Sequence, residues 1–302
     1  MSLKDTYQSR KNLLAQNLTA MGVTASGTEG LTTLINKVLD IPTIETYNLT
    51  LSTNKNIISQ AHSESAILTI TVTNNQGQAV ADKTVTILKN GVYYTSATTN
   101  SSGIATITYN SQATGDIQFI ANINDNISNS VLVEDCFYFN DGTINDIAIN
   151  SGTSVTIENG AIKITKSSNG EHKWYFPTLR KFTTSENIAM ILESAREDET
   201  GQIAAVSINP SLSASTQGYA GYWTSNNQWD INFGDGSVGS SINLQKGDII
   251  TFSRENGYTK LYHNGVLQHQ YLRSISDYYM GGYTNQNRIQ RWKNIKIKAI
   301  TV

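Results

Sequence analysis

The sequence predicts a mainly β protein that begins with a short helical segment and continues into two β-sandwiches, the second one a large jelly roll. Three observations predict this fold class. Apolar residues recur at helical spacing only in the first 43 residues. Further on, they alternate with Thr and other polar residues in short runs. Asn-Gly pairs, which favour tight hairpin turns, stand between several of these runs.

The chain has few charged residues and many uncharged polar ones. The chain has 302 residues, a formal net charge of −2 and only 15% charged residues. This near-neutral balance gives no electrostatic case for binding nucleic acid or an anionic membrane. The polarity comes from 35 Thr, 30 Ser and 31 Asn instead. Such a composition is typical of a β-rich surface protein and not of a disordered tail.

The cysteine content and the N-terminal residues further restrict the kind of protein that this sequence can be. The single cysteine, Cys136, excludes a disulfide within the chain, and we expect it to be a buried, small apolar residue. No run approaches the roughly 18 apolar residues of a membrane span. Asp5, Gln8 and Arg10 stand where a signal peptide would need an apolar core. We therefore expect neither membrane insertion nor a signal peptide.

The first domain, residues 1–43, is predicted to hold two helices. The first helix ends at Gly22, and the second begins at a capping box of Ser26 and Glu29, or at Thr28, and stops at Pro42. Their apolar stripes are Leu3, Tyr7, Leu14, Leu18 and Met21, then Leu31, Leu34, Ile35, Val38 and Leu39. Helices this short are marginal alone, so the stripes need a partner. The candidates are the next domain, a larger assembly, or other copies of the chain, for which we expect a homotrimer.

The second domain, residues 44–134, is predicted to be a small sandwich. Asn90-Gly91 forms a hairpin turn between the runs Thr84–Lys89 and Val92–Ala97. The ordered motifs of this region are Asn74–Val80, Lys83–Thr86, Thr98–Thr106, Ala113–Asp116 and Phe119–Ala121. Together they resemble bacterial Ig-like domains of the invasin/intimin type, which implies a spacer. Its acidic residues are interpreted as solvated surface: Glu45, Glu64, Asp82, Asp116, Asp125 and Glu134.

The third domain, residues 135–302, holds all four Trp and most of the Tyr and Phe. The pairs Asn159-Gly160, Asn256-Gly257 and Asn264-Gly265 predict further hairpins. The run Lys293–Ile300 predicts a half-buried strand whose lysines face water. Motifs of this domain are Phe139–Gly142, Asn159–Ile164, Gly247–Phe252, Lys260–Leu267 and Trp292–Ile295. They resemble concanavalin A-like and laminin-G-like lectin sandwiches, which implies a jelly roll that binds carbohydrate.

Some families on this sandwich are glycoside hydrolases, which need a pair of catalytic carboxylates. The resemblance implies Glu-x-Asp-x-x-Glu on one strand, and no such string is present. The nearest acidic cluster, Glu193 with Glu197–Glu199, runs into a turn and is interpreted as a charged hairpin tip. The sequence therefore predicts that this protein is not an enzyme.

Lectin-type sandwiches often hold calcium with Asp, Asn and carbonyl oxygens. Asn140, Asp141 and Asp146 lie close in sequence, and Asp230 and Asp235 flank a glycine-containing loop. None of them forms an Asp-x-Asp-x-Asp loop, and such residues are ordinary turn formers. We therefore expect no cofactor, and calcium is the alternative, without a motif that supports it.

The stretch Tyr219–Asn232 is the candidate ligand site. Sugars stack their C–H faces on aromatic rings, and amides and carboxylates bind their hydroxyls. The candidate ligand-binding residues are Tyr219, Tyr222, Trp223, Trp229, Asp230 and Asn232. The alternative is that Trp223 and Trp229 are core aromatics, although alternation puts Tyr222 and Trp223 on opposite faces. A second candidate set is Tyr278, Tyr279, Tyr283, Asn285 and Asn287.

The order of helical anchor, spacer and lectin-like domain predicts a virion protein, outward-facing, that presents a carbohydrate-binding domain to a host surface. The helical start also resembles, loosely, the small helical leaders of phage tail and decoration proteins. The expected partners are a host-surface glycan, other virion proteins and copies of the chain. The alternatives are a purely architectural spike or decoration protein without a glycan ligand, or a cell-surface adhesin or polysaccharide-degrading enzyme.

Overall fold

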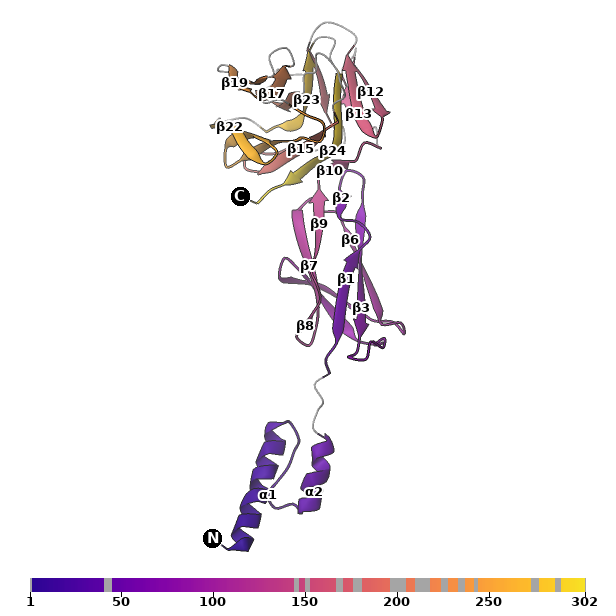
Figure 1. Ribbon diagram of the computed structural model, residues 1–302, viewed down its shortest axis with the longest axis vertical. Coiled ribbons are helices and arrows are strands. Elements are labelled where there is room, and N and C mark those ends of the chain that lie inside the picture. The colour runs from indigo at the N-terminus through magenta and orange to yellow at the C-terminus, as the bar shows by residue number, and fades with distance from the viewer. Residues whose placement is uncertain are drawn as a thin grey trace. The chain divides into compact units, whose positions relative to one another are not determined.

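The computed structural model shows a mainly β chain with helices at its N-terminus (Figure 1). One compact unit holds the helices and comprises Met1–Asn48 with Thr73–Gln78, and the other comprises Leu49–Val72 with Ala79–Val302. The structure describes residues 2–40, 45–143, 147–149, 153–166, 171–175, 181–195, 205–209, 218–223, 228–232, 237–241, 244–272, 277–285 and 289–301. The predicted fold class, mainly β with a short helical start and sandwich sheets, is confirmed.

Two helices and a 3-10 turn make up the helical pair: α1 (Leu3–Ala20), α2 (Leu31–Asn36) and η1 (Lys37–Asp40). Ser2 and Asp5 form a capping box at the start of α1 that the apolar pattern did not predict. Gly22, with φ of 85°, follows the end of α1 as predicted. The predicted caps of α2 are wrong, because Gly30 is its N-cap and Ser26 and Glu29 close a turn ahead of it. Pro42 lies outside the described residues.

The small sandwich follows, between residues 48 and 136. Its strands are β1 (Asn48–Thr53), β2 (Ile57–Ser59), β3 (Ser65–Thr73), β4 (Thr84–Lys89), β5 (Val92–Thr98), β6 (Ile104–Asn110), β7 (Gly115–Ile123), β8 (Asn126–Ile127) and β9 (Val131–Cys136). They form two sheets, β1-β3-β6 and β2-β9-β7-β4-β5, with β8 on β7. Tyr109 of β6 meets Phe119 of β7 between the sheets, with ring centroids 5.3 Å apart.

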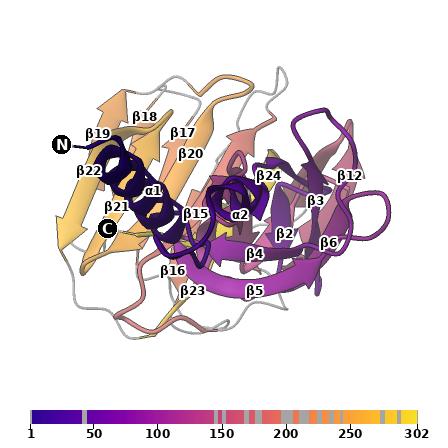
Figure 2. The same cartoon turned by 90° about the horizontal axis from the view of Figure 1, so that it is seen from below.

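The predicted hairpin at Asn90-Gly91 is confirmed. Both residues have positive φ, 51° and 79°, and they join β4 to β5, which lie side by side (Figure 2). Cys136 is fully buried, as predicted, and burial raises the pKa of its thiol to about 12. The resemblance to Ig-like domains, and the domain boundaries at residues 43 and 134, stay predictions.

The large sandwich begins with β10 (Tyr138–Asn140), one residue after β9. Its back sheet joins β12 (Thr153–Glu158), β13 (Ala161–Lys166), β24 (Ile289–Ala299), β15 (Ile188–Ser194), β20 (Ile249–Glu255), β21 (Tyr258–His263) and β22 (Val266–Leu272), with β10 on β24. Its front sheet joins β11 (Ala148–Ile149), β14 (Glu171–Tyr175), β23 (Tyr279–Asn285), β16 (Ala205–Asn209), β17 (Gly218–Trp223), β18 (Gln228–Asn232) and β19 (Ser237–Ser241). A core between the sheets includes Met190, Phe252, Met280, Trp292 and Ile297.

The closing strand β24 corrects one prediction. Its lysines Lys296 and Lys298 do not face water, because their ammonium groups lie 2.7 Å from carboxylate oxygens of Glu134 and Asp116 in the small sandwich. The interpretation of Glu134 as solvated surface is wrong for the same reason, whereas Asp116 stays half exposed beside Lys298, as that interpretation expects. The two sandwiches are therefore joined by ion pairs as well as by the chain. The other hairpins, at Asn159, Asn256 and Asn264, are as predicted.

Candidate functional site

The candidate ligand stretch forms a strand pair in the front sheet. Strand β17 ends at Trp223 and β18 begins at Gln228, as the sequence predicts. The antiparallel register sets Tyr222 opposite Trp229 and Tyr219 opposite Asn232. Residues 224–227 between the strands lie outside the described part of the chain.

The register assigns each candidate to a face of the front sheet. Tyr222 shares a face with Ala220, and Trp229 shares that face with Ile231, because residues two apart in a strand lie on the same face. Ala220 is paired with Val206 of β16, which is paired with Gly282 of β23. Gly282 lies two residues from Met280, whose side chain is fully buried in the core. Tyr222 and Trp229 therefore share the core face of the sheet.

The remaining four candidates, Tyr219, Trp223, Asp230 and Asn232, share the opposite face, here called the outer face. The sequence did not predict which candidates lie on which face. Alternation divides a strand into two faces, but only the pairing with neighbouring strands shows which face is turned to the core. The sheet therefore separates these four candidates from Tyr222 and Trp229. The assignment of these residues to a ligand stays a prediction.

The second candidate set falls on the same outer face. Tyr279, Tyr283 and Asn285 of β23 alternate with Met280, so they share a face with Tyr219. Tyr278 is different, because it is fully buried and its hydroxyl donates to the Glu186 carbonyl at 3.2 Å. Asn287 lies outside the described residues. Tyr219 and Tyr279, which are 60 residues apart in sequence, thus lie on one face of the front sheet.

Neighbouring strands continue this surface in two rows across the sheet. One row runs Lys173, Tyr283, Ala205, Gly221, Asp230 and Gly239. The next row runs Tyr175, Gly281, Ser207, Tyr219, Asn232 and Ser237. Tyrosines, small residues and polar residues are therefore intermixed on one face. Glycines inside strands often mark the close approach of a ligand or another backbone.

Sequence reasoning missed the members of these rows on β14 and β16, such as Lys173, Tyr175 and Ser207. They stand more than ten residues from the nearest candidate in sequence, and only strand pairing brings them beside Tyr283 and Tyr219. A usable signal was present in the glycines that stand between tyrosines in Tyr219–Tyr222 and Tyr279–Tyr283.

The acidic cluster interpreted as a hairpin tip has one described member, Glu193. Glu193 is inside β15 of the back sheet, so that interpretation is wrong for this residue. Its carboxylate accepts a hydrogen bond from the Asn294 amide at 2.6 Å. Residues 197–199 lie outside the described residues. Asn140 and Asp141 form a turn, in which their side chains accept from the Gly142 and Thr143 backbone amides at 2.8 and 3.0 Å.

One polar cluster of the back sheet was not predicted. The Asp248 carboxylate lies 2.9 Å from His263 Nε2 and accepts from the Asn264 amide at 2.9 Å. Burial of Asp248 disfavours its charge, but the bonds from Asn264, the Gln245 backbone and His263 outweigh burial and lower its pKa. These bonds tie the start of β20 to the end of β21. Among the described residues, no group of three or more His, Cys, Asp and Glu side chains could hold a metal ion.

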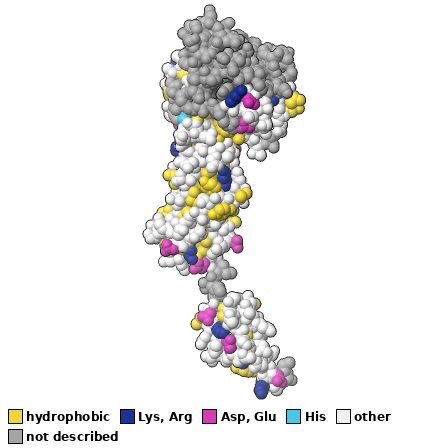
Figure 3. Space-filling model, turned by 180° about the vertical axis from the view of Figure 1, so that it is seen from behind, with side chains coloured by type: hydrophobic (Ala, Val, Ile, Leu, Met, Phe, Trp, Pro, Cys, Tyr) yellow, Lys and Arg dark blue, Asp and Glu magenta, His cyan; other side chains and the backbone are white. Residues whose placement is uncertain are grey.

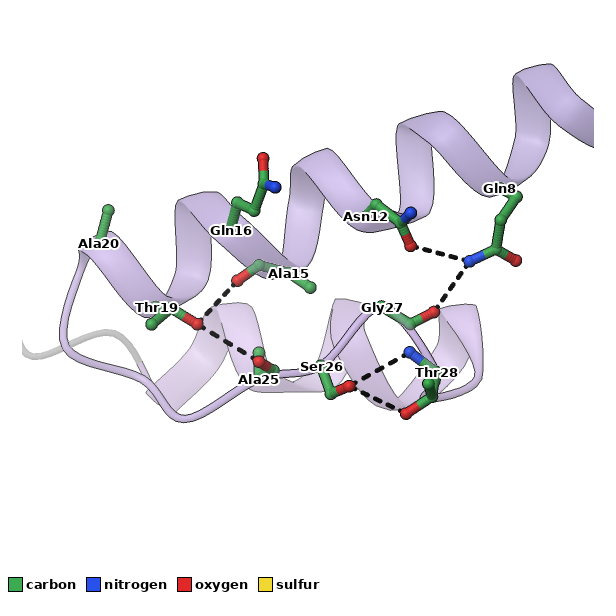
Figure 4. A pocket seen from close by; sticks show the side chains of 10 residues that line it. All are labelled: Gln8, Asn12, Ala15, Gln16, Thr19, Ala20, Ala25, Ser26, Gly27 and Thr28. Carbon is green, nitrogen blue, oxygen red and sulfur yellow. Dashed lines mark hydrogen bonds between the residues drawn. The ribbon is translucent and has the colours of Figure 1, made fainter.

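Two further surface features lie away from the front sheet. Hydrophobic side chains gather on the small sandwich (Figure 3), where a row joins Tyr93, Leu88 and Ile120 across β5, β4 and β7. The helical pair has a pocket of about 770 Å³ between α1 and residues 25–28 (Figure 4). Its lining is Gln8, Asn12, Ala15, Gln16, Thr19, Ala20, Ala25, Ser26, Gly27 and Thr28. None of these residues is titratable, so the pocket offers no acid–base chemistry. None of the described helices is long and apolar enough to cross a membrane.

Comparison with known proteins gives structural neighbours but no family. No family model and no curated protein matches the sequence. A Bacillus subtilis protein of unknown function with a galectin-like fold has a TM-score of 0.42 at 10% identity, covering 55% of this chain and 97% of its own. The carbohydrate recognition domain of Emp47p has a TM-score of 0.38 at 13% identity, covering 52% and 90%. An alginate lyase from Corynebacterium sp. has a TM-score of 0.38 at 14% identity, covering 51% and 83%. These scores lie below 0.5, so the likeness carries no argument about ligand or activity.

Proposed function

We propose that the large sandwich binds a carbohydrate on the outer face of its front sheet. The observation that carries the proposal is the register of β14, β23, β16, β17 and β18, which brings the candidate residues of two separate stretches onto one face. That face combines Tyr219, Trp223 and Tyr283 with Asp230 and Asn232.

The chemistry of these residue types suits a sugar. Aromatic rings give flat apolar surfaces with a negative face, which attracts the C–H groups of a pyranose ring. Asp accepts hydrogen bonds and Asn both donates and accepts, so the two together match hydroxyl groups, which do both. The small residues Ala205 and Ser207 of β16 lie between Tyr283 of β23 and Tyr219 of β17. A flat, polyhydroxylated ligand fits this pattern better than a purely apolar one.

Binding without hydrolysis is part of the proposal. The outer-face carboxylates at described positions include Glu171 on β14 and Asp230 on β18, with β23, β16 and β17 between them. Four strand spacings of about 4.8 Å place the two backbones roughly 19 Å apart. A hydrolytic pair must stand about 5–10 Å apart across the scissile bond. This pair of carboxylates therefore does not suit glycoside hydrolysis.

The biological setting that we propose rests on the order of the domains along the chain. A helical start, a small sandwich and an aromatic sandwich follow one another along the chain, which suits an outward-facing virion protein of the phage tail or decoration type. The glycan would then be a host-surface glycan, and other virion proteins would hold the helical start. The competing proposal is an architectural protein whose large sandwich has no ligand.

A glycan array probed with the full chain tests the proposal. We expect a restricted set of related glycans to bind, and we expect Tyr219→Ala and Asn232→Ala to lose that signal. Tyr93→Ala is the matched control, because Tyr93 is 64% exposed and lies on the small sandwich. An array without any bound glycan would favour the architectural protein. Binding that Tyr93→Ala abolishes and Tyr219→Ala does not would place the site on the small sandwich.

A further inference from the structure

The chain passes from the small sandwich into the large one without a linker. Strand β9 ends at Cys136 and β10 begins at Tyr138, so that Phe137 alone separates two strands of different sheets. Domains that move independently are usually joined by exposed, flexible segments that few contacts cross. Leu49–Val72 and Ala79–Val302, which hold both sandwiches, instead form one compact unit. The junction therefore differs from an ordinary domain boundary.

Phe137 is bonded to both sandwiches. Its backbone N–H donates to the Ile297 carbonyl of β24 at 2.8 Å. Its carbonyl accepts from the Ala61 N–H, in the loop between β2 and β3, at 3.0 Å. Its ring meets the buried Phe182 ring of the large sandwich edge to face, with centroids 5.1 Å apart. One residue thus ties a loop of the small sandwich to the closing strand of the large one.

The same loop follows the chain along the junction. The Gln60 N–H donates to the Cys136 carbonyl at 2.9 Å, just past the parallel pairing of β2 with β9. The ring of His62 lies 5.3 Å from the ring of Tyr138, the first residue of β10. These backbone hydrogen bonds leave little freedom for a hinge, because bending the chain here would break them.

Apolar side chains of the small sandwich complete the core of the large one. The buried cluster between the sheets of the large sandwich includes Ala113, which precedes β7 of the small sandwich. Ala61 packs against the same cluster. Separating the sandwiches would expose these contacts to water, together with part of Phe137, and the cost rises with the apolar area exposed. The core of the large sandwich is therefore complete only when the small one is in place.

Ion pairs add to the apolar contact. Lys296 Nζ lies 2.7 Å from Glu134 Oε2. Lys298 Nζ lies 2.7 Å from Asp116 Oδ1, and the Lys298 side chain is only 11% exposed. A largely buried ammonium group that loses its carboxylate costs more than an exposed ion pair contributes. Opening the junction would thus break backbone hydrogen bonds, apolar contacts and ion pairs at the same time.

We propose that the two sandwiches unfold as one cooperative unit, in which the small sandwich completes and stabilises the large one. Local opening is costly where buried contacts and hydrogen bonds are dense, so such a junction opens only when the whole unit unfolds. The small sandwich then does more than the spacing that its resemblance to Ig-like domains implies. It also holds the front sheet of the large sandwich in a fixed direction. The inference does not depend on the glycan site.

Urea unfolding of the full chain, followed by tryptophan fluorescence, tests this inference. All four tryptophans lie in residues 135–302, so the fluorescence reports on the large sandwich. Val72→Ala shortens a fully buried side chain of the small sandwich. Val72 lies seven residues, about 24 Å, along β3 from Ser65, which follows the junction loop. We expect this variant to move the fluorescence midpoint to a lower urea concentration, although the changed residue lies in the other sandwich.

Val92→Ala is the matched control, because the same substitution falls on a residue of β5 that is 69% exposed, and it should leave the midpoint unchanged. If Val72→Ala does not fold, Ile87→Val removes a single methyl group from a fully buried position of β4 and should give a smaller shift in the same direction. A midpoint that stays at the wild-type value in the buried variants would overturn the inference and show that the sandwiches unfold separately. An equal shift in Val92→Ala would also overturn it, because the effect would then not come from the core.

Discussion

Lys298 of the closing strand lies between two carboxylates of the small sandwich, with its Nζ 2.7 Å from Asp116 Oδ1 and 3.7 Å from Glu134 Oε2. Gly115 next to Asp116 approaches the same strand so closely that a Cβ there would lie 2.8 Å from the Ala299 carbonyl oxygen. The Phe137 amide also donates to the Ile297 carbonyl at 2.8 Å. The end of the chain thus packs on the small sandwich although it belongs to the large one.

A double-mutant cycle on Lys298→Met and Asp116→Asn should measure this junction. We expect a coupling free energy of about 0.5–1 kcal/mol, because Asp116 is half exposed and water screens the pair. Burial of Lys298 disfavours its charge, but the hydrogen bond to Asp116 and the charges of Glu134 and Asp116 outweigh it and raise its pKa. A raised pKa means that the coupling is complete below the unfolded value of about 10.4 and is lost as the pH rises through the higher pKa of the folded state. Urea unfolding of the four proteins of the cycle at neutral and at strongly alkaline pH measures the coupling and its loss. A coupling free energy that does not change with pH would contradict the ion pair.

Asp135→Asn should destabilise the small sandwich. The Asp135 carboxylate is fully buried and accepts from the Tyr109 hydroxyl at 2.8 Å and from the Gln112 and Thr114 backbone amides at 3.1 Å each. The Ser111 hydroxyl donates to it as well. An amide cannot accept at both ends, so we expect a loss of about 1–3 kcal/mol in the free energy of unfolding at neutral pH.

Acid should remove the same stabilisation from the wild-type chain. Burial of Asp135 disfavours its charge, but the bonds from Ser111, Thr114, Tyr109 and Gln112 prevail and lower its pKa. A lowered pKa gives stability that is present above the unfolded value of about 3.9 and is lost as the pH falls through the folded value. The difference between wild type and Asp135→Asn in urea unfolding should therefore shrink in acid. A constant difference would show that the carboxylate charge is unimportant.

Gly27→Ala should loosen the helical pair. A Cβ on Gly27 would lie 2.1 Å from Asn12 Oδ1 and 3.3 Å from Asn12 Cα, so Asn12 and the segment must move apart. We expect a loss of roughly 1–2 kcal/mol, read as an earlier loss of helix in far-UV circular dichroism on heating. Gly30→Ser is the control, because its Cβ would have no neighbour closer than 3.8 Å and serine is a good N-cap. Equal melting of wild type and Gly27→Ala would contradict the close packing.

Local patterns predicted the elements well. Asn90, Asn159, Asn256 and Asn264 each precede glycine, and each turn forms where the sequence places it, because the type I′ turn is a property of two residues. Gly22 ends α1 for an equally local reason.

The features that the sequence did not predict depend on contacts with residues that are distant along the chain. The ion pairs of Lys296 and Lys298 require the small sandwich, more than 160 residues away along the chain. The division of Tyr222 and Trp223 between two faces was predicted by alternation, but which of them shares a face with Met280 of β23 follows only from the strand register. Gly30 is the N-cap of α2, while Ser26 and Glu29 bond to each other in the turn before it.

The most direct test compares two tryptophans of one strand pair, Trp223 on the outer face and Trp229 on the core face, by calorimetric titration with the best glycan of the array and by thermal unfolding. We predict that Trp223→Ala weakens glycan binding at least tenfold, about 1.4 kcal/mol, and leaves the melting temperature close to that of the wild type. Trp229→Ala should instead lower the stability, by about 3–5 kcal/mol, which is the range for removing an aromatic side chain from between two packed sheets. Undiminished binding by Trp223→Ala, or a loss of stability for Trp223→Ala as large as that for Trp229→Ala, would contradict the assignment of the outer face as the carbohydrate site.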